Sequence, residues 1–190
     1  ADKKQKADRA ARSYEKILEL EPNNLKAAEA LIPIYTAASN SKALANAIEV
    51  KLSHEEDDYA KVALLREVAA LYEGRVKDPE KAFERYLTVF EIVPAEEQAA
   101  LDVERAAKTV NGFTRLVDAF KKAIDSSDSN GDRDTAVSLR LRLGRIYVDE
   151  LKQVDDALAA YRAVYDADPD NVPAITALEH LYRTTNNFGE

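Results

Sequence analysis

The stretch with the most suggestive chemistry is DSSDSNGDRD, residues 125–134, where acidic and amide side chains recur at short intervals. Carboxylate and amide oxygens are the ligands of Ca²⁺ in the 12-residue loop that binds this ion between two helices. Positions 3, 5, 6, 7 and 9 of such a loop would be Asp128, Asn130, Gly131, Asp132 and Asp134. Positions 1 and 12, which need carboxylates, would be Ser126 and Val137. We therefore predict a solvated polar loop between two helices, without a metal.

Other residues that could support chemistry are few and scattered. The chain has two histidines, His54 and His180, and neither has a second ligand at the spacing of a zinc site. It contains no cysteine, and its five glycines form no phosphate-binding loop. The adjacent carboxylates Asp155 and Asp156 suit a helix start, where they favour the helix dipole. We predict no catalytic residue, no cofactor and no metal site, and hence no enzyme activity in this chain.

The composition is that of a protein built from long helices. Of 190 residues, 46% are apolar and 33% charged, while there are only five glycines and six prolines. The formal net charge of −8 disfavours binding to nucleic acid or to an anionic membrane surface. No apolar run approaches the ~18 residues of a membrane span, and the opening residues do not form a signal peptide pattern. We expect neither nucleic-acid binding nor membrane insertion, and a cytoplasmic location by default.

An internal repeat organises the chain. Its clearest copy is KAFERYLTVFEIVP, residues 81–94, in which apolar residues at helical spacing lead to a proline. Matching residues recur upstream and downstream: Ala82, Tyr86, Val89 and Pro94 correspond to Ala10, Tyr14, Ile17 and Pro22, and to Ala157, Tyr161, Val164 and Pro169. The three prolines are 72 and 75 residues apart, and each interval holds four predicted helices. The elementary unit is a helix pair of about 36 to 38 residues, a length typical of solenoids.

Short breaks separate the predicted helices. They include Asn24, residues 39–41, Asp78 and residues 111–112, all suited to helix ends, while Pro33 falls inside a helix and predicts a kink. The fold is then all-α, one array of about ten helices over residues 1–190. Helix pairs are predicted at about 24–56, 59–93, 96–126 and 134–168, with half repeats at 5–21 and 171–190. The half repeats indicate a fragment of a longer repeat array, truncated at both ends.

Two of the helix pairs resemble the tetratricopeptide repeat family, whose 34-residue pairs share one packing pattern of large, small and aromatic residues closed by a proline. The matching residues are Leu139, Leu143, Gly144, Tyr147, Ala157, Tyr161, Val164 and Pro169, and likewise Leu64, Val68, Ala69, Tyr72, Ala82, Tyr86, Val89 and Pro94. The match requires one extra residue between the two helices. Other pairs fit less well, because Ile32 and Glu104 stand where the family has a small residue. The resemblance implies a right-handed α-solenoid of antiparallel helix pairs, with a solenoid of the HEAT or half-repeat type as the alternative.

The resemblance also implies binding of a protein or peptide on the concave face, which the first helix of each pair forms. Carrying the family's concave positions over to this sequence selects six basic residues: Lys26, Arg66, Arg105, Lys108, Arg145 and Arg183. It selects three acidic ones, Glu29, Glu73 and Asp149, so this face carries a net charge of +3. Because arginine pairs well with carboxylates, we hypothesise a groove for an acidic segment of a partner. The simpler interpretation is a mixed, solvated surface.

Two further functions stay open at this point. The chain could be a structural spacer or oligomerisation module of a larger assembly, which would contact partners through its ends or its convex side. It could also be a regulatory segment of an enzyme whose catalytic domain lies outside these 190 residues.

Two tyrosines are additional candidates for partner contact. Most tyrosines recur at one packing position of the repeat and are predicted to lie in the core. Tyr59 and Tyr165 lie off the repeated aromatic positions. Each is either a surface contact or, as we favour, a partly buried neighbour of another helix.

Overall fold

The computed structural model describes residues 2–185, and side chains from residue 5 onward. Within this range the regular structure consists of ten α-helices and two short π-helical turns, with no strand. This confirms the predicted all-α fold of about ten helices. Residues 186–190, which belong to the last predicted half repeat, lie outside the described range. The chain divides into two compact units, which we call unit 1 (residues 1–93) and unit 2 (residues 94–190).

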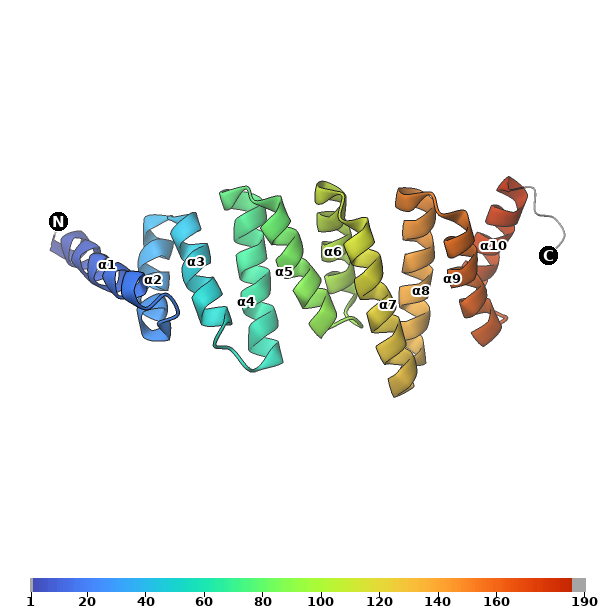
Figure 1. The fold of residues 1–190 in the computed structure, drawn as a ribbon, viewed down its shortest axis with the longest axis horizontal. Coiled ribbons are helices and arrows are strands. Elements are labelled where there is room, and N and C mark those ends of the chain that lie inside the picture. Colours follow the sequence, from blue (N-terminus) through green and yellow to red (C-terminus); the bar gives the residue numbers. More distant parts are fainter. Residues whose placement is uncertain (1, 186–190) are drawn as a thin grey trace. The chain divides into compact units, whose positions relative to one another are not determined.

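Unit 1 contains five α-helices in antiparallel succession, each packed on the next (Figure 1). They are α1 (Asp2–Leu20), α2 (Leu25–Ala38), α3 (Ser41–Leu52), α4 (Asp58–Leu71) and α5 (Pro79–Ile92), with the π-helical turn η1 (Tyr72–Val76) after α4. The short connections force neighbouring helices to lie side by side, so each buries its apolar stripe against the helices before and after it.

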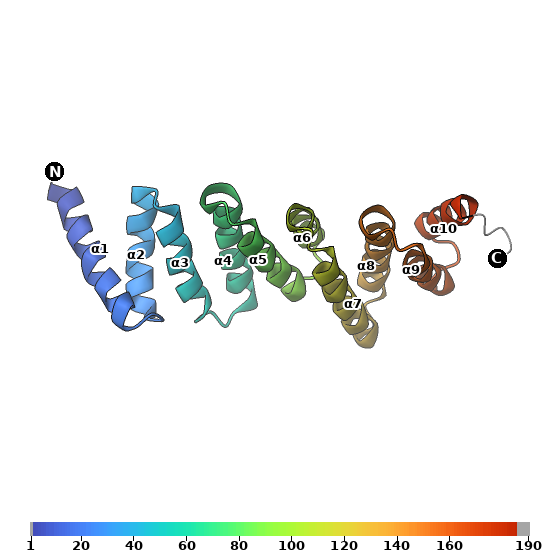
Figure 2. The ribbon, with the colours of Figure 1, turned by 45° about the horizontal axis from the view of Figure 1, so that its top comes forward.

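Unit 2 also contains five α-helices, but its π-helical turn follows the third helix of the unit and not the fourth (Figure 2). Its helices are α6 (Glu97–Val110), α7 (Phe113–Asn130), α8 (Arg133–Ile146), α9 (Val154–Ala167) and α10 (Val172–Thr184), with the π-helical turn η2 (Tyr147–Leu151) after α8. Across the described parts of both units, no helix is long and apolar enough to cross a membrane.

Four of the predicted helix ends are confirmed, at Asn24, Ser39, Asp78 and Asn111. The side chain of Asn24 caps α2 by accepting a hydrogen bond from the Ala27 backbone N–H at 3.0 Å, and that of Asp78 caps α5 in the same way. Ser39 and Asn111 adopt the left-handed conformation, each with φ of 54°, and so end their helices. Helix α2 continues through Pro33 without ending there.

The turns η1 and η2 each accommodate the one extra residue that these repeats have between their two helices, compared with the family pattern. After each turn a lysine, Lys77 or Lys152, adopts the left-handed conformation. The next backbone N–H then donates to the first carbonyl of the turn, with Asp78 to Tyr72 and Gln153 to Tyr147 both at 2.9 Å. A π-helical turn accommodates one residue more than an α-helical turn, so the inserted residue leaves the flanking helices intact.

The polar loop predicted at residues 125–134 is wrong, because α7 continues to Asn130 and is six residues longer than α3. Helix α7 ends at Gly131, whose φ of 75° suits glycine. The Nη1 of Arg140 on α8 donates to the Asp128 carboxylate at 3.1 Å. With residues 126–130 helical, the stretch cannot wrap around an ion, and the described residues contain no group of three or more potential metal ligands.

Candidate functional site

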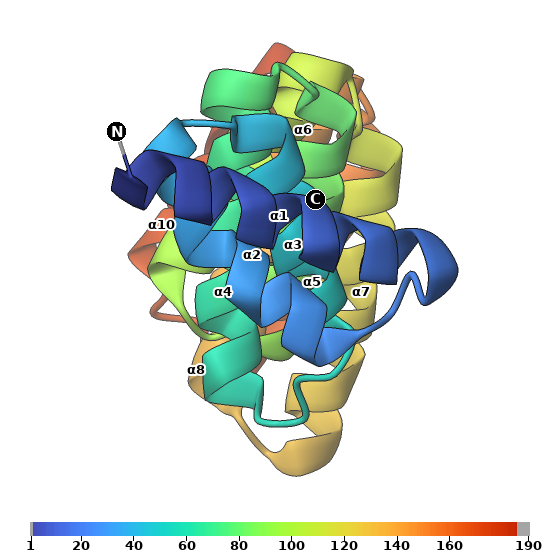
Figure 3. The ribbon, with the colours of Figure 1, turned by 90° about the vertical axis from the view of Figure 1, so that its left-hand side faces the viewer.

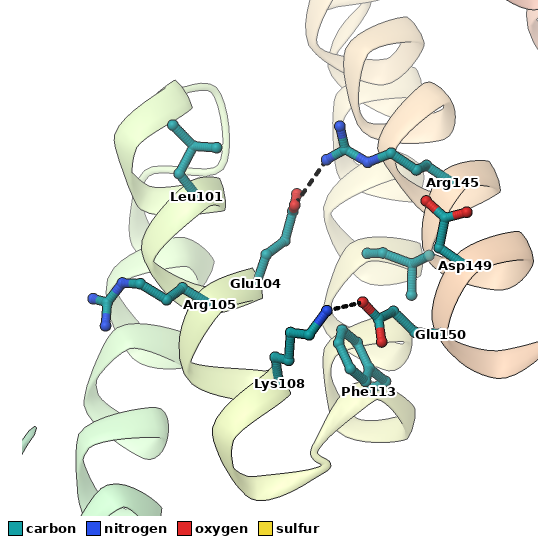
Figure 4. A pocket seen from close by; sticks show the side chains of 9 residues that line it. Leu101, Glu104, Arg105, Lys108, Phe113, Arg145, Asp149 and Glu150 are labelled. Atoms are coloured by element: carbon teal, nitrogen blue, oxygen red, sulfur yellow. Dashed lines mark hydrogen bonds and ion pairs between the residues drawn. The ribbon is translucent and has the colours of Figure 1, made fainter.

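The structure distributes the six predicted basic residues over both units. Lys26 on α2 and Arg66 on α4 belong to unit 1, and Arg183 lies on α10 of unit 2. The remaining three, Arg105 and Lys108 of α6 and Arg145 of α8, line one pocket of about 260 Å³ inside unit 2 (Figure 4). This pocket is the candidate site, and we call it the α6–α8 groove.

The α6–α8 groove has an apolar base and a charged rim. Leu101 of α6, Phe113 at the start of α7 and Ile146 at the end of α8 supply the apolar surface. Phe113 and Ile146 are buried, whereas Leu101 is partly open to solvent. The charged lining residues are Glu104, Arg105, Lys108, Arg145, Asp149 and Glu150.

Each of the three basic residues makes an ion pair. Arg145 Nη2 donates to Glu104 Oε2 at 2.8 Å, and Lys108 Nζ donates to Glu150 Oε1 at 3.0 Å (Figure 4). Arg105 Nη2 donates to Asp102 Oδ1 at 3.3 Å within α6. The first two pairs connect α6 to η2 and α8 across the groove.

In all three pairs the base is the more exposed partner. The side chain of Lys108 is 71% exposed and that of Glu150 28%; Arg145 is 54% exposed and Glu104 16%. Arg105 is 47% exposed, against 21% for Asp102. A ligand entering the groove therefore meets cationic groups first, although the charged lining residues sum to zero.

Glu104 is held by α8 from two sides. The guanidinium of Arg142, which is mostly buried, donates to Glu104 Oε1 at 2.9 Å and reaches Glu97 at 3.4 Å. With Arg145 on its other oxygen, Glu104 accepts from two arginines. A carboxylate fixed in this way is part of the framework, because both of its oxygens are occupied by charge-assisted hydrogen bonds.

Sequence reasoning found the bases of the groove and missed two of its acids. Glu104 and Glu150 lie outside the concave positions carried over from the family pattern, so the +3 of that face does not describe this pocket. The sequence does mark Glu104 as unusual, because it stands where the family has a small residue. Glu150 lies on η2, the turn that contains the inserted residue.

Comparison with known proteins identifies one repeat directly. Residues 137–171, which include most of α8 and all of η2 and α9, match the model of the tetratricopeptide repeat. No curated protein matches the sequence.

Among solved structures, the chain is similar to the MamA protein and to the apo form of RapI, each at 16% sequence identity. The match to MamA has a TM-score of 0.45 and covers 85% of this chain and 82% of MamA. The match to RapI has a TM-score of 0.48 and covers 93% of this chain and 55% of RapI, so the chain spans about half the length of RapI.

Proposed function

We propose that this chain, a helical-repeat protein of the tetratricopeptide type, is a binding scaffold that holds an acidic segment of a partner protein in the α6–α8 groove. The fold is suited to protein–protein interaction, since stacked helix pairs present extended surfaces for binding. The observation that supports the acidic ligand is the consistent outward position of the base in the three ion pairs.

The existing ion pairs would not prevent an acidic ligand from binding. An exposed salt bridge contributes only ~0–1 kcal/mol, so the Lys108–Glu150 pair is exchanged at little cost when a carboxylate of the partner arrives. Arg145 has a planar guanidinium with donors beyond the one engaged by Glu104, and it can pair with a second carboxylate. Leu101 offers adjacent apolar surface, so the preferred segment combines acidic residues with an apolar one.

Binding without catalysis is the function that these groups support. The groove is lined by carboxylates, basic groups and apolar side chains, with no serine, threonine or histidine among the lining residues.

The test uses two defined probes and a matched pair of variants. The probes are a short labelled peptide rich in Asp, Glu and Leu, and its counterpart with Lys in place of every acidic residue. We expect the acidic peptide to bind, and Lys108→Gln and Arg145→Gln together to weaken it about tenfold or more. Lys122→Gln removes one charge from the exposed side of α7, outside the groove, and should leave affinity nearly unchanged.

Two further measurements make the test decisive. Affinity for the acidic peptide should fall as salt is added, because screening weakens pairing between exposed charges. Far-UV circular dichroism should show that the groove variants keep their helical content, since Arg142 still holds Glu104. Equal binding of both peptides, or full affinity in the double variant, would refute the acidic groove and favour a spacer role.

A further inference from the structure

The two tyrosines that lie off the repeated positions are on the surface of the molecule. Tyr59 is 88% exposed and Tyr165 is 42% exposed, so the favoured interpretation of a partly buried residue is wrong for Tyr59. The tyrosines at the repeated position of the first helices are more informative. Each of them lies beside one charged side chain of the preceding helix, and this recurring pair leads to a second site.

The charged neighbour of the tyrosine differs in sign between the two units. The pairs are Tyr35 with Glu15, Tyr72 with Glu49, Tyr147 with Lys121 and Tyr182 with Arg162. The repeat matches Glu49 with Lys121 and Glu15 with Arg162. The same position of the repeat is therefore acidic in unit 1 and basic in unit 2.

Unit 1 can be compared with itself one repeat further on. Helices α1, α3 and α5 share one packing position, which is occupied by Tyr14, Ile48 and Tyr86. Glu15 and Glu49 directly follow this position, on α1 and α3, so they are equivalent. Ala47 and Arg85 directly precede it, on α3 and α5, and are equivalent too. The helices α1, α2 and α3 therefore correspond to α3, α4 and α5.

Around Tyr72, an arginine joins the tyrosine and the glutamate. Arg85 of α5 donates from Nε to Glu49 Oε1 at 2.7 Å, and these two side chains are only 29% and 23% exposed. Burial and Glu49 raise the pKa of Tyr72, and the positive charge of Arg85 opposes this rise, so the guanidinium lies near the hydroxyl as well. A glutamate, a tyrosine and an arginine thus meet across three consecutive helices.

Around Tyr35, an alanine takes the place of the arginine. The Tyr35 hydroxyl donates to Glu15 Oε1 at 2.9 Å, but α3 has Ala47 where α5 has Arg85. A pocket of about 420 Å³, which we call the α1–α3 pocket, opens beside Ala47 and is walled by α1, α2 and α3. Figure 3 shows α1 in front of the other two helices. The α1–α3 pocket has the same three walls as the site of Arg85, so the small side chain of Ala47 accounts for the open space.

The α1–α3 pocket combines negative charge with an apolar base. Its charged lining residues are Glu15 and Glu19 of α1, both exposed, and no lining residue is basic. Within the described residues, no base forms an ion pair with either carboxylate. Leu18, Ala47 and Val50 also line the pocket and belong to the apolar cluster between these helices. Carboxylates beside an apolar surface suit a long basic side chain, whose stem is apolar and whose end is charged.

From this comparison we infer that the α1–α3 pocket binds an arginine side chain of a partner protein, in the position that Arg85 occupies one repeat further on. The guanidinium pairs with Glu15, and it can also donate to the hydroxyl oxygen of Tyr35, which still accepts while its proton is donated to Glu15. The aliphatic stem lies on Leu18 and Val50. The ligand is therefore an arginine with apolar neighbours, opposite in sign to the ligand of the α6–α8 groove.

The experiment uses the full chain and three short labelled peptides that differ at one position. The first has an arginine between leucines, the second has lysine there, and the third has citrulline, which keeps the shape of arginine without its charge. We expect saturable binding of the arginine peptide by fluorescence anisotropy. The other two should bind about tenfold more weakly, because lysine lacks the planar fork of donors and citrulline lacks the charge.

Variants of the pocket test where the arginine peptide binds. Glu15→Gln and Glu19→Gln together should weaken binding about tenfold or more, although the amide oxygen at position 15 can still accept from Tyr35. Ala47→Arg should abolish binding while the helical content is kept, because it fills the pocket from within. Glu56→Gln is the matched control, because Glu56 is exposed in the connection between α3 and α4 and outside the pocket lining.

Every other outcome counts against the inference. Absence of binding, equal binding of either counterpart peptide, or full affinity in the double glutamine variant would overturn it. Unfolding of Ala47→Arg, seen by far-UV circular dichroism, would remove the equivalence with Arg85 on which it rests. Self-association in sedimentation velocity that Ala47→Arg abolishes would assign the pocket to a second copy of the chain. Lys108→Gln and Arg145→Gln should leave binding of the arginine peptide unchanged, so failure here is separable from failure of the proposed groove.

Discussion

Substitution of Gly144 by alanine tests the packing argument at a close contact between two helices of the repeat. Gly144 is buried on α8, opposite the ring of Tyr161 on α9. A Cβ atom placed on Gly144 would lie 2.6 Å from Cζ of Tyr161 and 2.7 and 2.8 Å from its two Cε atoms. Carbon atoms do not approach this closely without displacement, so the buried ring or the helix must move.

The magnitude follows from two opposing effects. Overpacking a filled core costs ~1–3 kcal/mol, because the surrounding side chains leave their preferred positions. Alanine in place of glycine in a helix stabilises by ~1 kcal/mol. We therefore expect Gly144→Ala to lower the free energy of unfolding by up to ~2 kcal/mol.

The chain contains a control for the same substitution. Gly74 on η1 has no atom within 4 Å of the position that a Cβ would occupy, apart from those of its own turn of helix. Gly74→Ala should leave the urea midpoint unchanged or raise it, whereas Gly144→Ala should lower it. Urea unfolding of each variant is followed by far-UV circular dichroism and by tyrosine fluorescence. If the two signals give the same midpoint, unfolding is two-state and the midpoints can be converted to free energies of unfolding. If Gly144→Ala raises the midpoint as Gly74→Ala does, the close-contact argument is refuted.

Two further outcomes are expected. Tyr86→Ala should lower the free energy of unfolding, measured in urea, by ~3–5 kcal/mol, because Tyr86 is buried between helices. Tyr14→Ala should lower it by less, because Tyr14 is only partly buried. Equal losses would contradict the packing of stacked repeats. Burial, followed by the negative charge of Glu49, raises the pKa of Tyr72 from 10.0 to about 12. The unfolded chain loses this proton first, so stability should fall between those two pKa values, and Tyr72→Phe should flatten the decline measured from urea midpoints across that pH range.

The local features of the fold were predictable because short-range signals encode them. Asn24 and Asp78 cap helices through their own side chains, and Asn111 ends one by adopting the left-handed conformation. In two of the three copies the repeated alanine and tyrosine are buried, because helix pairs need close approach at one point and filling at another. These properties depend on residues within a few positions of one another, and a single sequence shows them.

The extension of α7 was not predictable in the same way. Its last turns contain serine and aspartate, which favour turns when considered alone. Ile124 and Ser127 are nevertheless buried, and Asp128 pairs with Arg140 of α8. Contacts with another helix therefore outweigh the local preference, and the sequence does not show those contacts.

The α6–α8 groove illustrates the same limit for the site. A rule of helix positions finds Lys108 and Arg145, because these residues point outward at a fixed spacing along their helices. It does not find the partner of either, because pairing depends on which residue the facing helix places opposite. The sequence predicts an excess of positive charge on this face, but the lining of the α6–α8 groove has no net charge. Only the difference in exposure between the two partners of each ion pair indicates whether a ligand meets positive or negative charge first.

The π-helical turns explain why the two units differ chemically on a shared backbone. Residues 73–75 of η1 correspond to residues 148–150 of η2 at the offset of 75. In unit 1, Glu73 accepts a hydrogen bond from the hydroxyl of Tyr86 at 3.2 Å, inside its own helix pair. In unit 2, Glu150 reaches Lys108 on α6, and Asp149 lines the same groove. The inserted residue that lengthens each repeat thus supplies a turn whose side chains can change without disturbing the helices. In unit 2 that turn contributes two of the groove's three acidic residues, and one of these forms the ion pair with Lys108.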